Sequence, residues 1–423
     1  MSVLEWVDAR AVRAFVRAGE GLRGGRLMIV AGTGCVTMGD EVDPFAATLE
    51  VHRPRMFRRA MLGGTIGLGE SFMDGDWSSP DLVILLRLML RNMAALDGLG
   101  GVASAIAGLC AKATRAWRDN TRVKSRRHIG RHYDLGNDFF RLFLDANLLY
   151  SCAVFEELED TLEVAQIRKL DRICRKLQLG PDDRVLEIGT GWGGFAAYAA
   201  TRYGCRVTTT TISRKQHEHA ARWFASLDAS GERITLLDRD YRELTGRYEK
   251  IVSIEMFEAV GFNHYDEFFG AVERLLAPDG AALIQTITVD DQRFEAYRAA
   301  ADWVEKYIFP GGELAALGAI LQSVARTTDM SLFHAENIGM HYTATLHAWR
   351  ERFTARLPEV RALGYDDRFI RMWDLYLAYC EAAFAERYIG DYQLLLTKNR
   401  ASRSLYGDPP TRARAELTVP AFP

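Results

Sequence analysis

The amino-acid sequence predicts an α/β protein built on a doubly wound parallel sheet, with a smaller, mixed but mainly helical domain before it. Two observations carry this prediction. From about residue 184 onward, short apolar runs alternate with amphipathic stretches of helical length, a pattern typical of parallel strands joined by helices. The first apolar run ends in a glycine turn, Gly189 to Gly194, that leads directly into a helix. Ligands of such sheets bind at the carboxyl ends of the strands, so this turn marks the expected site.

The composition is typical of a soluble globular protein. The chain has 423 residues, of which 48% are hydrophobic, enough for a sizeable core in about two or three domains. A formal net charge of −3 gives no reason to expect nucleic-acid binding. The six cysteines show no metal-ligand spacing, so we expect no metal site and a reducing cytoplasm. We recognise no signal peptide, and the most apolar window, Leu82 to Leu90, is too interrupted beyond its end to span a bilayer.

Residues 1–110 form the predicted N-terminal domain. The expected elements are helices at 3–16 and 82–93 and strands at 26–30 and 47–52. The segment Gly67 to Trp77 has two interpretations. It is either an ordinary loop in a packed helical subdomain or part of a domain that docks on a membrane or forms a dimer.

Residues 112–132 are strongly basic. They hold eight lysines and arginines against one acidic residue, Asp119, which gives a local charge of +7. Interleaved with Trp117, such a stretch suits the anionic surface of a bilayer, where each positive charge contributes roughly 1 kcal/mol. A solvated linker between domains explains the composition equally well. We assign 111–127 as a basic linker and 128–423 as the main domain.

A segment dense in polar and aromatic residues opens the main domain. It runs from His132 to Phe140 and is followed by Leu149 to Ala153. Its position just before a nucleotide-type fold favours a lid over a cofactor, although a surface loop packed by its own aromatic residues is the alternative.

Strands and helices then alternate to the end of the predicted sheet. The expected strands are 184–188, 206–210, 234–237, 250–254 and 281–288, and the expected helices are 161–177, 194–203, 213–225, 264–276 and 292–304.

The glycine turn alone does not choose its ligand. It can bind a dinucleotide pyrophosphate or the amino-acid end and ribose of S-adenosylmethionine. A dinucleotide site would need an acidic residue about 20 positions beyond the first glycine, but 208–213 contain none. Asp240 and Tyr241, after the third strand, are suited to hold an adenine, and Glu187 lies beside the turn. These residues favour S-adenosylmethionine.

Several motifs in order resemble the cyclopropane fatty acid synthase family, which includes the mycolic acid cyclopropane synthases. The resemblance covers about residues 60 to 400. It rests on His132 to Phe140, Tyr150-Ser151-Cys152, the glycine turn, Thr211-Ile212-Ser213 with Gln216, Met256 to Gly261, Tyr307 to Gly312 and Tyr379 to Phe384; Gly67 to Trp77 also resembles the longer, phospholipid-acting members. The resemblance implies a doubly wound, Rossmann-like class I methyltransferase sheet in the catalytic domain, 128–423.

The resemblance also implies the reaction. Family members transfer the methyl group of S-adenosylmethionine to a cis double bond of an acyl chain, usually in a membrane phospholipid. The alkene is a poor nucleophile, so catalysis lies in positioning it and in tolerating the carbocation that follows. A bound bicarbonate then takes a proton and the cyclopropane ring closes.

By resemblance, bicarbonate binds to the backbone of Cys152 and Ile287 and to the side chains of Glu258 and Tyr342. The sequence departs from the family at Gln285, where a histidine is usual. Glutamine donates a hydrogen bond but has no titratable proton. The resemblance implies a cyclopropane product, and the departure at Gln285 gives the alternative, a methyl-branched or methylene chain formed by loss of a different proton. Cys152 lacks an evident base and is not expected to be a nucleophile.

The cofactor contacts implied by the resemblance come from the lid, the turn and the strand ends. They are Tyr133, Tyr150, Ser151, Glu187, Gly189, Gly191, Gly193, Thr211, Gln216, Asp240 and Tyr241. The family further suggests a homodimer in peripheral contact with the inner face of the membrane. Two rivals stay open: a small-molecule methyltransferase on the same scaffold, and a lipid-binding module that has lost catalysis.

Overall fold

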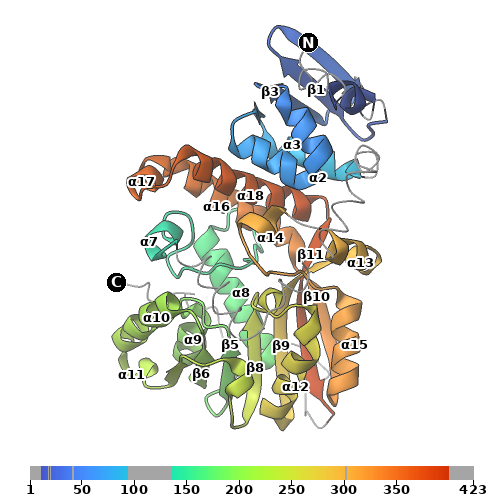
Figure 1. Cartoon of the computed structure of the whole chain (residues 1–423). Coiled ribbons are helices and arrows are strands. Elements are labelled where there is room, and N and C mark those ends of the chain that lie inside the picture. The colour runs from blue at the N-terminus through green and yellow to red at the C-terminus, as the bar shows by residue number, and fades with distance from the viewer. Residues whose placement is uncertain are drawn as a thin grey trace. The chain divides into compact units, whose positions relative to one another are not determined.

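The computed structural model describes residues 11–17, 19, 21–40, 42–93, 135–300 and 303–399, and these residues form two compact units (Figure 1). The first unit takes its described residues from Met1–Arg118, Glu295–Ile308 and Trp349–Tyr388; the second takes them from Asp119–Phe294, Phe309–Ala348 and Ile389–Pro423. The basic stretch 112–132 and Tyr133 lie outside the described residues, as does the start of the helix predicted at 3–16. No helix among the described residues is long and apolar enough to cross a membrane.

The second unit contains a seven-stranded, mostly parallel sheet in the order β10-β11-β9-β8-β5-β6-β7. Its strands are β5 (Arg184–Ile188), β6 (Arg206–Thr210), β7 (Ile234–Leu237), β8 (Tyr248–Ile254), β9 (Leu276–Val289), β10 (Met330–Asn337) and β11 (Ile389–Lys398). Strands β5 to β9 are parallel, and they include every strand predicted for this domain. The predicted fold class is confirmed.

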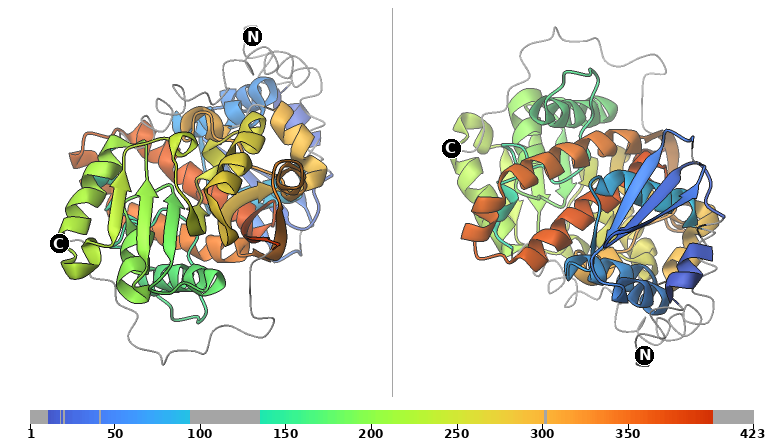
Figure 2. Two further views of the ribbon diagram at one scale, coloured as in Figure 1. Left: turned by 90° about the horizontal axis from the view of Figure 1, so that it is seen from below. Right: turned by 90° about the horizontal axis from the view of Figure 1, so that it is seen from above.

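Helices cover both faces of this sheet, as the left view of Figure 2 shows. They are α8 (Leu162–Leu177), α9 (Gly194–Tyr198) with a π-helical extension (Ala199–Tyr203), α10 (Arg214–Ser226), α11 (Asp228–Gly231), α12 (Tyr265–Leu275) and α15 (Leu317–Thr327). Helices α8, α10 and α12 agree with the prediction to within one residue at each end. The helix predicted at 292–304 is instead two helices, α13 (Asp291–Ala299) and α14 (Trp303–Tyr307).

Each sheet face has its own apolar core because side chains alternate along a strand. Val185 belongs to the core shared with α8, α9 and α10. Its neighbour Leu186 belongs to the core shared with α12 and α15. Both side chains are fully buried, so β5 is covered on both faces, as expected for a central parallel strand.

The prediction did not include the two antiparallel strands. Strand β11 lies between β9 and β10 and pairs with both in antiparallel fashion. Its register sets Gln393 opposite Gln285 and Asp391 opposite Ile287. The C-terminal strand therefore brings polar residues next to those predicted for the site.

The first unit combines a small sheet with helices from distant parts of the chain. Its sheet has the order β2-β1-β3-β4, formed by β1 (Arg26–Ala31), β2 (Gly34–Gly39), β3 (Ala46–Val51) and β4 (Trp77–Ser78). Its helices include α2 (Arg55–Met73), α3 (Leu82–Arg91), α17 (Leu357–Ala362) and α18 (Asp367–Ala385), and α18 packs on α2 and α3. Helix α3 begins where predicted because Asp81 accepts a hydrogen bond from the Ile84 backbone nitrogen.

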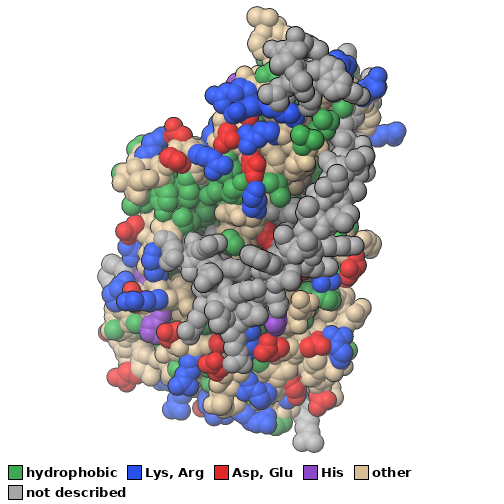
Figure 3. All heavy atoms as spheres, in the orientation of Figure 1, with side chains coloured by type: hydrophobic (Ala, Val, Ile, Leu, Met, Phe, Trp, Pro, Cys, Tyr) green, Lys and Arg blue, Asp and Glu red, His purple; other side chains and the backbone are tan. Residues whose placement is uncertain are grey.

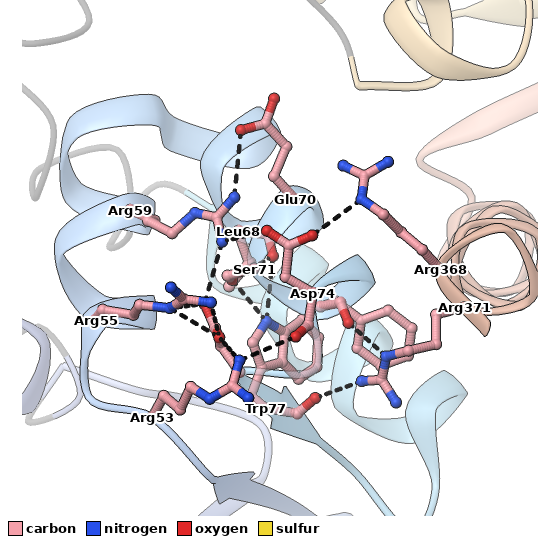
Figure 4. Close-up of polar contacts among 12 residues, drawn as sticks. Arg53, Arg55, Arg59, Leu68, Glu70, Ser71, Asp74, Trp77, Arg368 and Arg371 are labelled. Carbon is pink, nitrogen blue, oxygen red and sulfur yellow. Dashed lines mark hydrogen bonds and ion pairs between the residues drawn. The ribbon is translucent and has the colours of Figure 1, made fainter. Parts of the chain in front are cut away.

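The segment Gly67 to Trp77 forms a buried charge network in this unit (Figure 4). The Asp76 side chain is fully buried and binds three guanidinium groups, those of Arg53, Arg55 and Arg59. A buried carboxylate needs such partners, since an unpaired charge away from water is costly.

The same segment is tied to the C-terminal helix α18. The indole nitrogen of Trp77 donates to Ser71 Oγ at 2.9 Å and to the Leu68 carbonyl at 3.1 Å. Arg371 of α18 donates to the Trp77 carbonyl at 2.7 Å. Gly67 to Met73 form the end of α2, so most of the segment is helix and not a loop. A role of this domain in membrane docking or dimerisation stays a prediction.

Candidate active site

The glycine turn lies at the carboxyl end of β5 and has the conformation that its composition predicts. Gly189, Gly191 and Gly193 have φ angles of 103°, 54° and 107°, which side chains rarely adopt. A Cβ at Gly189 would meet Met256 at 3.0 Å, and one at Gly193 would meet Phe224 at 2.8 Å. A Cβ at Gly191 would meet nothing within 4 Å. The turn is therefore packed from behind and open at Gly191, which suits a ligand cradle.

Glu187 is a buried carboxyl group beside this cradle. It is 2% exposed and accepts a hydrogen bond from Thr209 at 2.5 Å. Burial raises the pKa of Glu187 to about 8. A carboxyl group with this pKa is mostly protonated at neutral pH, and a cationic group brought to the turn would favour its ionised form.

Residues after β6 and β7 line the same edge of the sheet. Thr211 donates from its hydroxyl to Gln216 Oε1 at 3.0 Å, so the two residues form one polar pair. Asp240 is bound by the Arg242 guanidinium at 2.7 and 2.8 Å. Tyr241 packs on Phe268, with ring centroids 5.4 Å apart. Adenine binding by Asp240 and Tyr241 stays a prediction.

The segment predicted as a lid covers the glycine turn. Its described part forms the short helix α7 (Asn137–Phe140). The Trp192 indole of the turn donates to Asn137 at 2.9 Å, and its ring lies 5.0 Å from that of Phe140. Tyr150 packs on Phe140 and on Phe309. These aromatic contacts hold the segment over the turn.

The centre of the site is a residue that the prediction missed, Glu255. It directly follows β8 and has a φ of 47°, an unusual value for a residue other than glycine. Its carboxylate accepts hydrogen bonds from the Cys152 backbone nitrogen at 2.7 Å, from Gln285 Nε2 at 2.7 Å and from the Tyr342 hydroxyl at 2.6 Å. Three residues predicted to contact bicarbonate thus bind a carboxylate of the chain itself.

The two remaining predicted bicarbonate ligands bind each other. Glu258 Oε1 accepts hydrogen bonds from the Ile287 backbone nitrogen at 2.6 Å and from the Thr286 hydroxyl at 3.0 Å. Burial, together with the nearby Glu255 carboxylate, raises the pKa of Glu258 to about 7. Its Oε2 atom is buried and has no hydrogen-bond partner within the described part of the chain.

A third buried carboxyl group, Asp391 of β11, completes the cluster. Gln285 Nε2 donates to its Oδ2 atom at 3.2 Å. Burial and the two glutamates raise the pKa of Asp391 well above its usual range. The fully buried ammonium of Lys169 interacts with this cluster and donates to Ser151 Oγ at 2.6 Å. Three carboxyl groups share this cluster with one ammonium, and a cation bound beside them would favour their ionised forms.

The Cys152 thiol is inert by the same physics. Burial, and then the nearby Asp391 and Glu255, raise its pKa well above the usual value, so it does not form a thiolate at neutral pH. Its backbone nitrogen donates to Glu255, and binding of bicarbonate by this nitrogen stays a prediction.

Two of the missed residues left a signal in the sequence. Lys169 lies within the buried stripe of α8, between Gln166 and Leu170, where a lysine needs a partner. Asp391 is the acidic residue of a strand whose following residues, Tyr392 to Thr397, carry no charge. Glu255 left none, because an acidic residue at the end of a strand is ordinarily exposed.

Comparison with known proteins identifies the family of the chain. A sequence model of the family described as mycolic acid cyclopropane synthetase matches residues 120–394. The chain belongs to this family. It is an S-adenosylmethionine-dependent methyltransferase similar to cyclopropane-fatty-acyl-phospholipid synthase, as the motifs indicated.

Two relatives with differently named activities match over most of their length. The chain is 39% identical to the tuberculostearic acid methyltransferase UfaA1 of Mycobacterium tuberculosis, over 84% of each chain. It is 38% identical to the cyclopropane-fatty-acyl-phospholipid synthase of Escherichia coli, over 83% of this chain and 88% of the relative. One relative is thus named as a methyltransferase and the other as a cyclopropane-forming enzyme.

Solved structures of the family match the fold. The cyclopropane synthase MmaA2 from Mycobacterium tuberculosis aligns with a TM-score of 0.60 and 32% identity, over 64% of this chain and 98% of that one. The mycolic acid cyclopropane synthase CmaA1, solved with S-adenosylhomocysteine, aligns with a TM-score of 0.60 and 30% identity, over the same shares. These likenesses support S-adenosylmethionine as the cofactor.

Proposed function

We propose that this methyltransferase adds a methyl group to the cis double bond of an unsaturated acyl chain in a membrane phospholipid, and that Glu255 accepts the proton whose loss ends the reaction. The product is then a methyl-branched or methylene chain. The observation that carries this proposal is that the Glu255 carboxylate accepts hydrogen bonds from Cys152, Gln285 and Tyr342.

The reaction balances with these groups. The alkene electron pair forms a new carbon–carbon bond to the methyl group, and the sulfur of S-adenosylmethionine keeps the electrons of the bond that breaks. The neighbouring carbon becomes a cation. The buried carboxyl cluster stabilises this positive charge, because it lies in a water-excluded site. Loss of a proton to Glu255 from the carbon that carries the new methyl group then leaves the C–H electron pair in a double bond and gives a methyl-branched alkene. A methylene chain forms when the hydrogen on that carbon first moves with its electron pair to the cationic carbon, and Glu255 then takes a proton from the new methyl group.

The same contacts argue against bicarbonate as the base. A bound bicarbonate would need the donors that Glu255 already occupies, and the Ile287 nitrogen is occupied by Glu258. Glu255 is held at both oxygens, so the proton acceptor is fixed by the chain. This removes the freely bound base that ring closure requires in the family and favours the branched product.

Cyclopropane formation is the second candidate. Glu255 lies among the groups that the family uses for bicarbonate, so it could remove a proton from the new methyl group. That loss would close the ring instead of forming a double bond. The two outcomes share every step up to the carbocation.

For the cofactor, we propose the open face of the turn at Gly191, flanked by Glu187 and by the pair of Thr211 and Gln216. Ser151 and Tyr150 contribute from the lid side, while Asp240 and Tyr241 contribute from the end of β7. When bound, S-adenosylmethionine supplies an electrophilic methyl group on a positively charged sulfur. The carboxyl cluster near Met256, whose side chain backs Gly189, suits that charge.

We further propose that the enzyme is a homodimer bound peripherally at the inner face of the membrane. Its N-terminal region, about 1–110, contacts the lipid or the partner copy. Residues 111–127 are a basic linker, and 128–423 are the catalytic domain. Figure 3 shows Lys and Arg side chains gathered over the part of the first unit that holds β3 and α3, and acidic and basic side chains intermixed over the part that holds the sheet. In the first unit, the side chains of Arg53 and Arg55 are 58% and 42% exposed. Flotation with anionic vesicles tests this surface; no binding at low salt would contradict it.

Product analysis tests the proposed reaction. The protein is expressed in a host rich in unsaturated phospholipids and fed methionine with a trideuterated methyl group. A cyclopropane or a methylene chain keeps two deuterons, whereas a methyl-branched alkene keeps all three. Mild hydrogenation then adds hydrogen to the branched alkenes and leaves a cyclopropane intact. A ring product would favour the second candidate, and no labelled acyl chain at all would refute acyl methylation.

A further inference from the structure

A chain of hydrogen bonds leads from the surface into the carboxyl cluster. The Gln285 amide uses Nε2 to donate to Glu255 and Asp391, while its Oε1 accepts from Gln393 Nε2 at 3.0 Å. Both glutamines are fully buried. They lie opposite each other in the pairing of β9 with β11, so the strand register alone brings the two amides together.

The outer end of this chain is a cation. Lys176 of α8 donates from Nζ to Gln393 Oε1 at 2.7 Å and forms an ion pair with Glu336 at 2.5 Å. An ammonium group can only donate hydrogen bonds. Gln393 must therefore turn its oxygen to Lys176 and its nitrogen to Gln285. Gln285 must then turn its oxygen to Gln393 and its nitrogen to the carboxyl groups.

We propose that Lys176 and Gln393 are positioning residues that fix the direction of the Gln285 amide, so that Glu255 always faces a hydrogen-bond donor and remains able to accept a proton. This inference rests on the proposed function of Glu255 as the base. It explains how a glutamine, which cannot change charge, still controls the proton acceptor.

A reversed amide would have the opposite effect. The Gln285 oxygen would then face two carboxyl groups and would favour their protonated forms, since hydrogen bonds to a charged form are what stabilise it. Glu255 would have a higher pKa and would carry a proton at neutral pH. The ionisable groups that face Glu255 are Cys152, Lys169, Glu258, Tyr342 and Asp391.

The Gln393→Glu variant tests this directly. The new carboxylate keeps its pairing with Lys176 but cannot donate, so Gln285 is expected to turn its nitrogen toward position 393. The acidic limb of kcat against pH, measured on vesicles of unsaturated phospholipid, should move up by at least about one pH unit. At pH values on the acidic side of that limb, kcat should be at least about tenfold lower than in the parent. Gln393→Met, which removes the partner without reversing the amide, should shift the limb less.

Lys176 provides an independent test near the surface. Lys176→Met removes the obligatory donor and should move the limb in the same direction, whereas Lys176→Arg retains a donor and should restore the parent profile. If Gln393→Glu does not fold, the comparison of Lys176→Met with Lys176→Arg still tests whether this chain of hydrogen bonds sets the pH profile. Coincident pH profiles for the parent, Gln393→Glu and Lys176→Met, with unchanged melting temperatures, would overturn the proposal.

Infrared spectroscopy separates this proposal from the proposed function. The carbonyl stretch of a protonated carboxylic acid, assigned with Glu255→Gln, should appear at a higher pH in Gln393→Glu than in the parent. This measurement needs no methyl transfer. A shifted band in an enzyme that makes cyclopropane would refute the proposed product and support the role of Lys176 and Gln393; an unshifted band would overturn that role.

Discussion

The carboxylate of Glu255 lies 2.6 Å from the hydroxyl of Tyr342, which joins the end of β8 to α16 (Gly339–Ala355). Burial raises the pKa of Glu255, while this hydroxyl, the Cys152 nitrogen and the Gln285 amide oppose the rise. The site thus holds a carboxylate where the resemblance predicted a bound anion.

Replacing Glu255 by glycine should make the enzyme depend on added bicarbonate. The parent rate is expected to be the same with and without bicarbonate, because its donors are occupied. Glu255→Gly frees those donors and suits the φ of 47°, so the fold should tolerate it. Added bicarbonate should raise the rate of this variant at least about tenfold. Glu255→Gln fills the same space and should not respond, and a parent enzyme that slows when bicarbonate is depleted would contradict the prediction.

Glu258 should make the protein less stable as the pH rises. Its pKa is near 4.5 in the unfolded chain and about 7 in the folded protein, so its contribution is full below about pH 4.5 and is lost as the pH rises to about 7. The loss amounts to about 3 kcal/mol. Glu258→Gln should flatten the dependence of the unfolding free energy between about pH 5 and about pH 8, measured by urea denaturation. An identical slope in the variant would argue against a raised pKa.

Gly191→Ala should weaken cofactor binding. Alanine at a φ of 54° costs about 1 kcal/mol of strain, and its Cβ would enter the open side of the cradle. Gly246→Ala is the matched control, since Gly246 also has a positive φ of 99° and no atom nearer than 3.9 Å to an added Cβ. Calorimetry with S-adenosylhomocysteine should show at least about tenfold weaker binding for Gly191→Ala alone. Equal affinities would place the cofactor elsewhere.

Asp76→Asn should destabilise the first unit. The substitution leaves three guanidinium groups around a buried neutral side chain, at a cost of about 3 kcal/mol. Asp74→Asn serves as the comparison, because the Asp74 side chain is 29% exposed and its replacement should reduce the stability less. Thermal unfolding of both variants checks the order. A smaller effect at Asp76 than at Asp74 would show that the network does not support this unit.

Local patterns were enough to predict the parallel sheet. The strands β5, β6 and β7 begin and end at the predicted residues, because each is a short run rich in apolar or β-branched residues and bounded by turns. The glycine turn was predictable for the same reason, since its positive φ angles require glycine. Where a structure depends only on residues within one turn or strand, the residue types are enough to predict it.

The composition of the site was less predictable, because it depends on pairings between distant segments. Glu255 and Cys152 are far apart in sequence, yet in the folded protein the Cys152 backbone nitrogen lies 2.7 Å from Glu255 Oε1. Glu258, three residues away from Glu255, was predicted to bind the anion, and in the structure it accepts hydrogen bonds from Thr286 and Ile287. Its role in anion binding stays a prediction. The choice between two nearby carboxylates depends on the unusual φ of Glu255, which no pattern of residue types reveals.

The position of β11 has a consequence for synthesis. A nascent chain that has emerged only as far as β9 already has the glycine turn, Glu255 and Gln285, but lacks Asp391 and Gln393, which arrive with Ile389–Lys398. The central strands can thus form before the groups that orient the proton acceptor exist. The proton acceptor therefore gains its full set of partners only when the last strand pairs with β9.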